Sequence, residues 1–508
     1  MNLPRAKDAD IALLLEGTFP YVSGGVSSWV NQIIRAFPKY RFAIVFLGSR
    51  REDYGELKYP LPDNVVHMET WYMHEFQRSE AKPEKRAGNA ETFDVVRCMH
   101  AGFAAGHDPS EALAAFHKLA PAILPGGELP EADFLHSENA WEMVCDHYHR
   151  FCTDPSFVDY FWTVRNMHAP LWQLGRIAHT LIPARAYHSV STGYAGFLGA
   201  LLSSIHGRPL ILSEHGIYTK ERKIDLFKSE WIRDNRNVFQ RDPTELSHFR
   251  QLWIRFFEWM GRFCYDAADP IIALYENNRL RQVADGAAPA RTRNIPNGIS
   301  LDRFRPLREQ RPSSVPPVLC LIGRVVPIKD VKTFIRAMRR VVNLLPNAEG
   351  WIAGPADEDQ EYAQECRNLA ESLGIADKVK FLGHQKIEDI LPKIGLVVLS
   401  SISEALPLVL LEGFAAGVPA VSTDVGSCRQ LIEGLEEEDQ ALGAAGTVVD
   451  IADPTALADA AIALLNDQPC WQAASKAGIT RVERYYSDEL MFSRYRAVYA
   501  NALQAGED

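Results

Sequence analysis

Short apolar runs rich in Val, Ile and Leu recur along the chain, and a helical segment separates most of them from the next. Runs of this kind are typical of strands buried on both faces of a parallel sheet. The pattern predicts two α/β domains that face each other, each built on a doubly wound parallel sheet. The predicted strands are residues 11–15, 42–47, 186–191, 210–213, 271–274 and 293–295 in the first half, and 318–322, 350–352, 379–381, 396–399 and 420–422 in the second.

Proline density marks the boundary between the two halves, because prolines crowd residues 296–317. We therefore predict a first domain of residues 1–299 and a second domain of residues 300–484. A C-terminal helix within residues 485–508 is expected to pack back on the first domain. The irregular, charged region at about residues 48–181 is predicted to form helical insertions in the first domain.

Composition excludes some classes of function. The chain has 508 residues, a net charge of -11 and a pI of about 5.8, an acidic balance that argues against a nucleic-acid-binding protein. Its eight cysteines are scattered without a C-x-x-C pair, as in a reducing compartment. No secretory signal and no apolar stretch long enough to span a bilayer are visible, so we expect a cytoplasmic protein.

Two cations follow the first strand of the second half. The pair Gly323-Arg324 comes directly after residues 318–322, and Lys329 lies five residues beyond Arg324. Phosphates bind at the strand ends of doubly wound domains, and an Arg fork with a Lys point charge suits a diphosphate. Two solvated cations ahead of a helix are an equally good interpretation of this motif alone.

Two acids follow a later strand of the same half. Glu404 comes after residues 396–399, and Glu412 lies eight residues later on the next helix, a rise of about 12 Å that returns to nearly the same face. One carboxylate could bind sugar hydroxyls and the other ribose hydroxyls, with the helix start holding a diphosphate between them. Alternatively, Glu404 is a helix-start acid favoured by the dipole. Glu412 stands among apolar residues, where carboxylates are rare unless they are paired or liganded.

These motifs resemble those of glycosyltransferase family 4, whose members are retaining enzymes of the GT-B architecture with two Rossmann-like domains. The resemblance covers most of residues 290–485. It rests on Gly323-Arg324 with Lys329, on residues 403–407 (Ser-Glu-Ala-Leu-Pro) with Glu412-Gly413, on residues 415–421 (Ala-Ala-Gly-Val-Pro-Ala-Val) and on Pro296-Asn297-Gly298-Ile299.

The first half narrows the resemblance to the PelF branch of that family, which serves Pel exopolysaccharide synthesis and biofilm formation in bacteria. The matching motifs are residues 16–29 (EGTFPYVSGGVSSW) and residues 213–222 (SEHGIYTKER). The resemblance implies a UDP-sugar donor carrying a hexose or N-acetylhexosamine, a polysaccharide acceptor and membrane-bound partner proteins of the same pathway. These partners would place the enzyme peripherally at the inner membrane. No cofactor and no metal are implied.

The resemblance also implies roles for individual residues. Arg324 and Lys329 would stabilise the diphosphate leaving group, and Glu404 would bind the transferred sugar. Catalytic roles fall to Arg324, Lys329, Glu404 and His215, which would touch the donor sugar near the reacting carbon. The other expected donor-binding residues are Gly24, Gly25, Gly383, His384, Ala405, Leu406 and Glu412.

Three further patterns have plainer explanations. Asp357-Glu358-Asp359 imitates a D-x-D metal site but precedes a helix, so helix capping accounts for it. Cys145, His149 and Cys152 share a helical face that could bind zinc, although a packed helix is the favoured interpretation. An aromatic stripe is expected to be core rather than a sugar-stacking platform, and comprises Trp253, Phe256, Phe257, Trp259, Met260 and Phe263.

Two other functions remain open at this point. One is a non-catalytic GT-B module that binds a nucleotide-sugar as an assembly partner, and the other is a nucleotide-sugar epimerase. A dinucleotide oxidoreductase is disfavoured, because neither half opens with a G-x-G-x-x-G turn.

Overall fold

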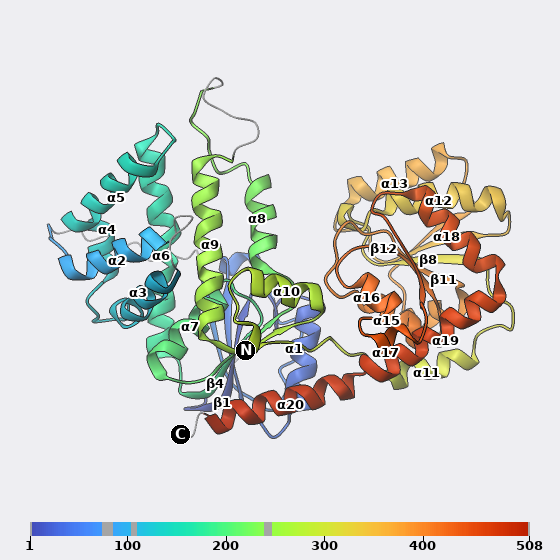
Figure 1. The fold of residues 1–508 in the computed structure, drawn as a ribbon, viewed down its shortest axis with the longest axis horizontal. Coiled ribbons are helices and arrows are strands. Elements are labelled where there is room, and N and C mark those ends of the chain that lie inside the picture. The colour runs from blue at the N-terminus through green and yellow to red at the C-terminus, as the bar shows by residue number, and fades with distance from the viewer. Residues whose placement is uncertain (1–2, 74–84, 103–108, 238–245, 506–508) are drawn as a thin grey trace. The chain divides into compact units, whose positions relative to one another are not determined.

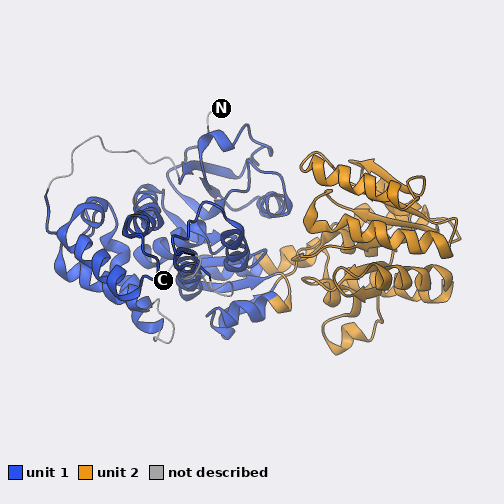
Figure 2. Cartoon of the chain, turned by 90° about the horizontal axis from the view of Figure 1, so that it is seen from above, with its two compact units in different colours: residues 1–273, 278–294, 496–508 blue, residues 274–277, 295–495 orange. Residues whose placement is uncertain are grey.

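The computed structural model describes residues 3–73, 85–102, 109–237 and 246–505, and the chain divides into two compact units (Figures 1 and 2). Unit 1 comprises residues 1–273, 278–294 and 496–508, and unit 2 comprises residues 274–277 and 295–495. The sequence prediction placed the boundary at residues 299 and 300. Each unit is described by itself below.

Unit 1 is built on a seven-stranded sheet in the order β3-β2-β1-β4-β5-β6-β7, in which every pair is parallel. Strand order reverses between β1 and β4, which makes this a doubly wound sheet. The strands are β1 (Ala9–Glu16), β2 (Phe42–Gly48), β3 (Val65–Tyr72), β4 (Ala184–Ser189), β5 (Leu210–Glu214), β6 (Ala268–Ala273) and β7 (Thr292–Asn294).

Helices cover this sheet and extend beyond it. In the core, α7 packs on β1, β4 and β5 and also on α9, which in turn contacts β5 and β6. The helices of the parent fold are α1 (Gly25–Ala36), α7 (Tyr194–His206), α8 (Tyr218–Lys228), α9 (His248–Ala267) and α10 (Glu276–Ala284). The inserted helices are α2 (Ala90–Gly102), α3 (Pro109–Ala122), α4 (Glu131–His136), α5 (Glu138–Phe151) and α6 (Phe157–Thr180).

The prediction that residues 48–181 form helical insertions throughout is wrong in its first part. β3 lies within this region and pairs with β2 along its length, so it belongs to the parent sheet. The pattern concealed it because His67, Glu69 and Thr70 interrupt the apolar run. His67 and Glu69 pair with each other, since His67 Nε2 lies 3.0 Å from Glu69 Oε1. The helical insertion proper begins at α2.

Unit 2 is built on a six-stranded parallel sheet in the order β10-β9-β8-β11-β12-β13. The strands are β8 (Val318–Ile322), β9 (Glu349–Ala353), β10 (Val379–Gly383), β11 (Leu396–Leu399), β12 (Ala420–Thr423) and β13 (Gly446–Val449). The helices are α11 (Leu301–Glu309), α12 (Val331–Leu344), α13 (Gln360–Ser372), α14 (Ile387–Ile390), α15 (Leu408–Ala415), α16 (Cys428–Glu433), α17 (Glu437–Gln440), α18 (Pro454–Asn466) and α19 (Gln468–Tyr485).

The central strands β8 and β11 of unit 2 are apolar throughout because both faces of the sheet are buried there. Along β11, Val397 and Leu399 join one hydrophobic cluster, which includes α15 and α16, whereas Leu396 and Val398 join another under α12 and α18. Figure 1 shows these helices on opposite sides of β8, β11 and β12. The prediction of two doubly wound α/β units is therefore confirmed.

The structure shows what becomes of the proline-rich segment and of the predicted C-terminal helix. Much of the proline-rich segment is not an extended linker, because α11 occupies residues 301–309 and buries Phe304 and Leu307. The C-terminal helix α20 (Asp488–Ala505) begins in unit 2 and ends in unit 1. Its last turns lie against unit 1, where the Tyr499 hydroxyl is 2.9 Å from His188 Nδ1.

Candidate active site

The cations and acids singled out in the sequence follow two strands that are neighbours in unit 2. Arg324 and Lys329 come after β8, Glu404 comes after β11, and β8 pairs directly with β11. Strand order reverses at this pair, with β9 and β10 on one side and β12 and β13 on the other. Loops diverge at such a reversal and leave a crevice at the carboxyl ends of the strands, which is where doubly wound domains bind ligands.

Lys329 and Glu404 are in direct contact at this point. The Lys329 ammonium donates to Glu404 Oε1 at 2.5 Å, and the Ser401 hydroxyl donates to the same oxygen at 2.6 Å. Their side chains are 22% and 14% exposed, so the pair is largely shielded from water yet reachable. The Lys329 stem passes over Gly323, where a β-carbon would meet its Cε at 3.5 Å. Sequence reasoning missed Ser401, although it stands just after the strand in the pair Ser400-Ser401.

Backbone hydrogen bonds hold the Glu404 loop between its two neighbours. On one side, Ile402 N donates to Ile328 O at 2.9 Å and the Ser400 hydroxyl donates to Lys329 O at 3.0 Å. On the other side, Ser427 N donates to Ala405 O at 2.9 Å. The position of Glu404 therefore depends on the loops after β8 and β12 together.

Gly426, after β12, is predicted to be required for this placement. Its φ is +55, and a β-carbon there would collide with the carbonyl oxygens of Glu404 and Ala405. We expect Gly426→Ala to displace the Glu404 peptide and to lower turnover by roughly tenfold or more, as small misplacements of a catalytic group do. Steady-state turnover of the purified variants measures this.

Gly374→Ala is the matched control for Gly426→Ala. Its φ is +66, so it incurs the same left-handed strain of about 1–2 kcal/mol, but no atom lies within 4 Å of the added carbon. Equal loss of turnover in the two variants would mean that backbone strain, and not the position of Glu404, explains the effect.

Glu412 lies on α15, whose first turn directly follows the Glu404 loop. Its side chain is half-buried, and it has no hydrogen bond or ion pair with any described side chain. Burial raises the pKa of Glu412 to about 7, with Arg303 opposing the shift and Glu388 adding to it. A shielded carboxyl group without a protein partner is suited to accept hydrogen bonds from a ligand.

If Glu412 binds ribose hydroxyls as the family resemblance implies, its pKa predicts that nucleotide affinity depends on pH. Ribose hydroxyls bind the ionised form best, and the ionised fraction falls about tenfold for each pH unit below the pKa. We expect UDP affinity to fall by up to about tenfold between pH 8 and pH 6, measured by calorimetry. The Glu412→Gln variant should bind UDP about 1–3 kcal/mol more weakly at pH 8 and show only the titration of UDP itself. Identical pH profiles for the parent protein and the Glu412→Gln variant would mean that Glu412 does not contact the nucleotide.

Arg324 pairs with a different carboxylate from the one that Lys329 contacts. Its guanidinium Nη1 donates to Glu358 at 2.7 and 2.6 Å, and both side chains are about half exposed. Arg324 therefore does not contact Glu404. A diphosphate that binds Arg324 would have to share its guanidinium group with Glu358. The neighbouring Asp359 caps α13 by accepting from Tyr362 N at 2.9 Å, which agrees with the capping interpretation of the D-x-D-like sequence.

Gly383 ends β10 and His384 follows it, and both are exposed at the same end of the sheet. Gly383 has φ +64 and its carbonyl accepts from Gly354 N at 2.8 Å. No contact joins His384 to the Lys329–Glu404 pair among the described residues. Its proposed contact with a nucleotide base stays a prediction.

In unit 1, the helix α1, which begins at Gly25 with Gly24 as its N-cap, contacts His215 through its Trp29 side chain. Gly24 and Gly25 are exposed, with no atom within 4 Å of an added β-carbon, and they open α1. Trp29 of α1 packs against His215, which follows β5, with ring centroids 4.6 Å apart. Burial lowers the pKa of His215 to about 4, so the imidazole is neutral near pH 7, and its Nε2 has no hydrogen-bond partner among the described residues.

Sequence reasoning missed a second polar cluster at the carboxyl edge of the unit 1 sheet. Glu16 ends β1 and accepts from the Tyr218 hydroxyl at 3.1 Å and from Ala195 N at 3.3 Å, and Arg222 Nε donates to the Tyr218 hydroxyl at 3.2 Å. Burial raises the pKa of Glu16, while the charge of Arg222 opposes the shift. The signal was present, since Glu16 directly follows an apolar strand.

The remaining candidates have structural explanations. Within the described ranges, no group of three or more His, Cys, Asp or Glu side chains could hold a metal ion, so Cys145, His149 and Cys152 form no zinc site there. The aromatic stripe of α9 belongs to the core of unit 1, as predicted.

Comparison with family models identifies both parts of the chain. Residues 9–290 match the model described as Domain of unknown function (DUF3492), which is more than half of the chain. The chain belongs to this family. Residues 304–481, which contain the Lys329–Glu404 pair, match the model Glycosyl transferases group 1. This DUF3492 protein therefore carries a group 1 glycosyltransferase domain as its unit 2.

Individual relatives match over part of their length. The Rhizobium meliloti lipopolysaccharide core biosynthesis mannosyltransferase LpsB is 29% identical over 44% of this chain and 66% of its own length. The Bacillus anthracis N-acetyl-alpha-D-glucosaminyl L-malate synthase is 29% identical over 37% of this chain and 46% of its own length. The chain thus covers less than two thirds of each of these relatives.

A solved structure matches over the whole fold. Anabaena HepE in complex with UDP-glucose shares 14% identity with a TM-score of 0.56, covering 97% of this chain and 99% of that chain. This likeness shows the GT-B fold of the DUF3492 protein. None of the helices in the described part of the chain is long and apolar enough to cross a bilayer.

Proposed function

We propose that the protein is a retaining glycosyltransferase that takes a hexose or N-acetylhexosamine from a UDP-sugar. The observation that carries the proposal is the Lys329–Glu404 contact at 2.5 Å, at the reversal of strand order in the domain that matches Glycosyl transferases group 1. A shielded ammonium beside a carboxylate provides a cation for a leaving phosphate and an acceptor for sugar hydroxyls within one site.

The proposed reaction needs no metal, because protein groups at this site can neutralise a diphosphate. Lys329 supplies one positive charge, Arg324 can supply another, and α15 directs its first N–H groups toward the end of the Glu404 loop. Glu412 stands within the same helix as an acceptor for ribose hydroxyls. The cations stabilise the departing UDP, whose phosphate oxygen takes the acceptor proton on the same face of the sugar.

The acceptor in this proposal is a growing exopolysaccharide of the Pel type or its precursor. Its support is the resemblance of residues 16–29 and 213–222 to the PelF branch. Cytoplasmic catalysis beside membrane-bound partners of the same pathway belongs to the same proposal. The two relatives are named for different sugars, mannosyl in one and N-acetylglucosaminyl in the other, so the donor panel below includes both kinds.

Incubation of the purified full chain with a panel of nucleotide-sugars tests the proposal. We expect release of UDP from one UDP-sugar, no loss of rate in excess chelator, and a product anomer matching that of the donor by NMR. Tight binding of UDP-sugars without transfer or hydrolysis would instead indicate a non-catalytic assembly module. Sugar isomerisation without an acceptor would indicate an epimerase.

A further inference from the structure

The helical insertion of unit 1 and the parent helix α9 together line a cavity that the donor site does not use. Its volume is about 930 Å³, and side chains of α2, α5, α6 and α9 line it together with Thr153, Arg236 and Leu246. Among the described residues that line it, none belongs to a strand and none is a candidate site residue described above. Cavities that hold small ligands measure roughly 300–1,000 Å³, so this one is large enough for a ligand of its own.

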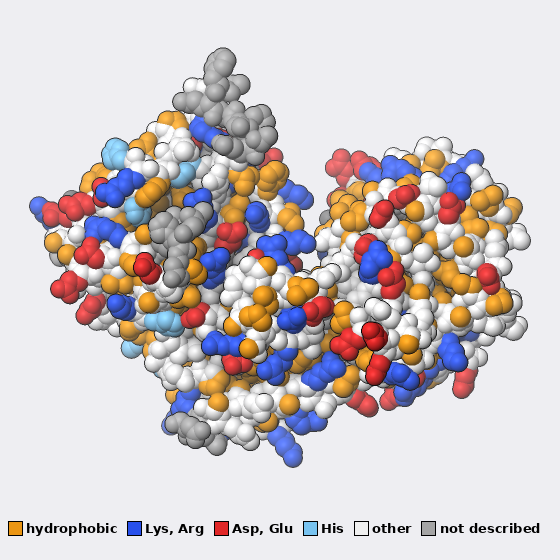
Figure 3. All heavy atoms as spheres, in the orientation of Figure 1, with side chains coloured by type: hydrophobic (Ala, Val, Ile, Leu, Met, Phe, Trp, Pro, Cys, Tyr) orange, Lys and Arg blue, Asp and Glu red, His pale blue; other side chains and the backbone are white. Residues whose placement is uncertain are grey.

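Arginines from several segments line this cavity. Arg97 pairs with Asp94 at 2.9 Å, Arg150 with Asp146 at 3.5 Å, and Arg236 with Asp234 at 3.0 Å. Arg255 of α9 lines it as well, and its guanidinium forms no ion pair with a carboxylate of the described residues. Figure 3 shows blue Lys or Arg and pale-blue His side chains over this part of unit 1. Arg255 is exposed, so the mouth of the cavity offers at least one cation for an anionic group.

Much of the remaining wall is apolar, although Asp146, His147 and Gln251 also line it. The apolar part includes Met143 and Val144 from α5, Val164 and Met167 from α6, and Phe256 from α9. A small hydrated anion would leave this surface unfilled, whereas an aliphatic chain would cover it and be stabilised by the apolar area removed from water. The combination of a cationic mouth and an apolar wall is the complement of an amphiphile.

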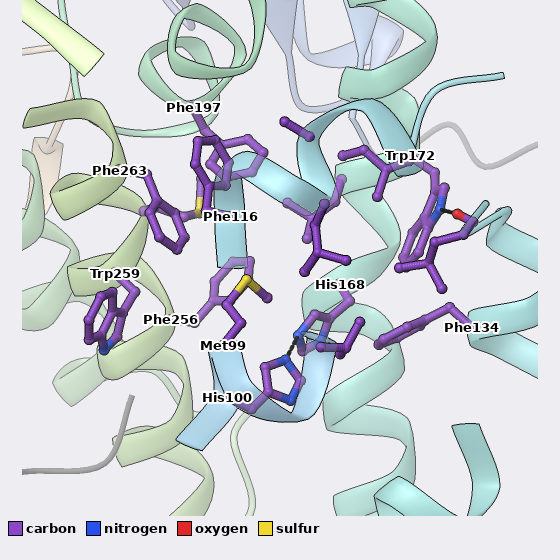
Figure 4. A pocket seen from close by; sticks show the side chains of 17 residues that line it. Met99, His100, Phe116, Phe134, His168, Trp172, Phe197, Phe256, Trp259 and Phe263 are labelled. Carbon is purple, nitrogen blue, oxygen red and sulfur yellow. Dashed lines mark hydrogen bonds between the residues drawn. The ribbon is translucent and has the colours of Figure 1, made fainter. Parts of the chain in front are cut away.

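A histidine pair stands between this cavity and a second, smaller one of about 50 Å³ that is lined by apolar and aromatic side chains (Figure 4). His168 Nδ1 lies 2.7 Å from the Val164 carbonyl, so it must donate there, and His168 Nε2 accepts from His100 Nε2 at 3.0 Å. Burial lowers the pKa of His168 to about 4, which keeps the ring uncharged near neutral pH. The inner end of the large cavity is therefore neutral, in contrast to its mouth.

We propose that the helical insertion binds an amphipathic anion, an aliphatic chain ending in a phosphate or carboxylate group, with the head at Arg255 and the chain along α5 and α6. This inference is independent of the proposed function, because none of its residues belongs to the Lys329–Glu404 site. It gives the insertion a lipid-type ligand, held in the unit that carries no nucleotide-binding residues of the group 1 domain.

Calorimetric titration of the full chain below the micelle concentration tests the proposal with four probes: dodecyl phosphate, dodecanoate, dodecyl maltoside and inorganic phosphate. We expect saturable one-to-one binding of an anionic amphiphile, weaker binding of the neutral maltoside, and no heat from inorganic phosphate. The tighter of the two anions identifies the head group. Equal affinity for the maltoside, or binding of none of the amphiphiles, would overturn the proposal.

Variants locate the site. Arg255→Gln should weaken binding of the anionic amphiphile roughly tenfold, as expected for a lost charge-assisted hydrogen bond. Arg262→Gln is the control, since Arg262 lies on the same helix but packs over Trp259, outside the cavity wall. Leu252→Trp, which fills the cavity and leaves every charge in place, should abolish binding while thermal melting confirms a folded protein. Equal effects of Arg255→Gln and Arg262→Gln, or unchanged binding in Leu252→Trp, would refute the assignment.

Discussion

Glu404→Gln is expected to reduce turnover of the UDP-sugar by about 10²–10³-fold while UDP affinity changes only a few-fold. The amide keeps the shape of the carboxylate but has no negative charge. In the parent protein the charged oxygen accepts hydrogen bonds from the Lys329 ammonium at 2.5 Å and from the Ser401 hydroxyl at 2.6 Å. Loss of one preorganised electrostatic group at a reacting centre typically costs a factor of this size. Initial rates of UDP release, together with calorimetric UDP affinity, separate the two effects.

Glu349→Gln provides the matched control. Glu349 also pairs with a lysine in unit 2, since Lys380 Nζ donates to its two oxygens at 2.7 Å, but it begins β9 at the opposite end of the sheet. This variant should keep its turnover. If Glu404→Gln stays within threefold of the parent rate, the Lys329–Glu404 pair is a structural contact and the proposed function loses its main support.

Arg481→Met is expected to destabilise unit 2 by about 3–5 kcal/mol. Arg481 is fully buried on α19, and its guanidinium donates to Asp439 Oδ1 at 2.6 Å and to the carbonyl oxygens of Ile432, Asp439 and Gly443 at 2.7 to 2.9 Å. Removing the cation leaves a buried carboxylate and three carbonyl groups without their partner, and breaking a buried pair in this way has a cost of that size. Hydrogen exchange of the α19 amides, followed by mass spectrometry, measures the change in opening free energy.

The exposed Arg484, three residues along the same helix, is the control for Arg481. Arg484→Met should change the opening free energy by less than about 0.5 kcal/mol, as surface substitutions usually do. A loss below 1 kcal/mol in Arg481→Met would show that water reaches the Asp439 carboxylate and replaces the arginine.

Patterns that are local along the chain could be predicted well. The strands β8 and β11 begin and end where their apolar runs do, because burial on both sheet faces requires an unbroken run. The stripe of α9 was placed correctly in the core for a similar reason. β3 was not predicted because polar residues interrupt its apolar run. Some of them find partners within the strand, where Trp71 Nε1 donates to Glu69 Oε2 at 3.0 Å.

The sequence by itself determined which residues stand at strand ends, and therefore that cations and acids collect at one edge of the unit 2 sheet. Only the tertiary structure decided which of them meet. Lys329 contacts Glu404, 75 positions away, because β8 and β11 are neighbours, whereas Arg324 turns to Glu358 on the loop after β9. The cavity beside the helical insertion was likewise beyond prediction, since its wall joins four helices whose packing no local periodicity encodes. Spacing along a chain reports which face a side chain occupies, but contacts between distant segments depend on how the elements pack.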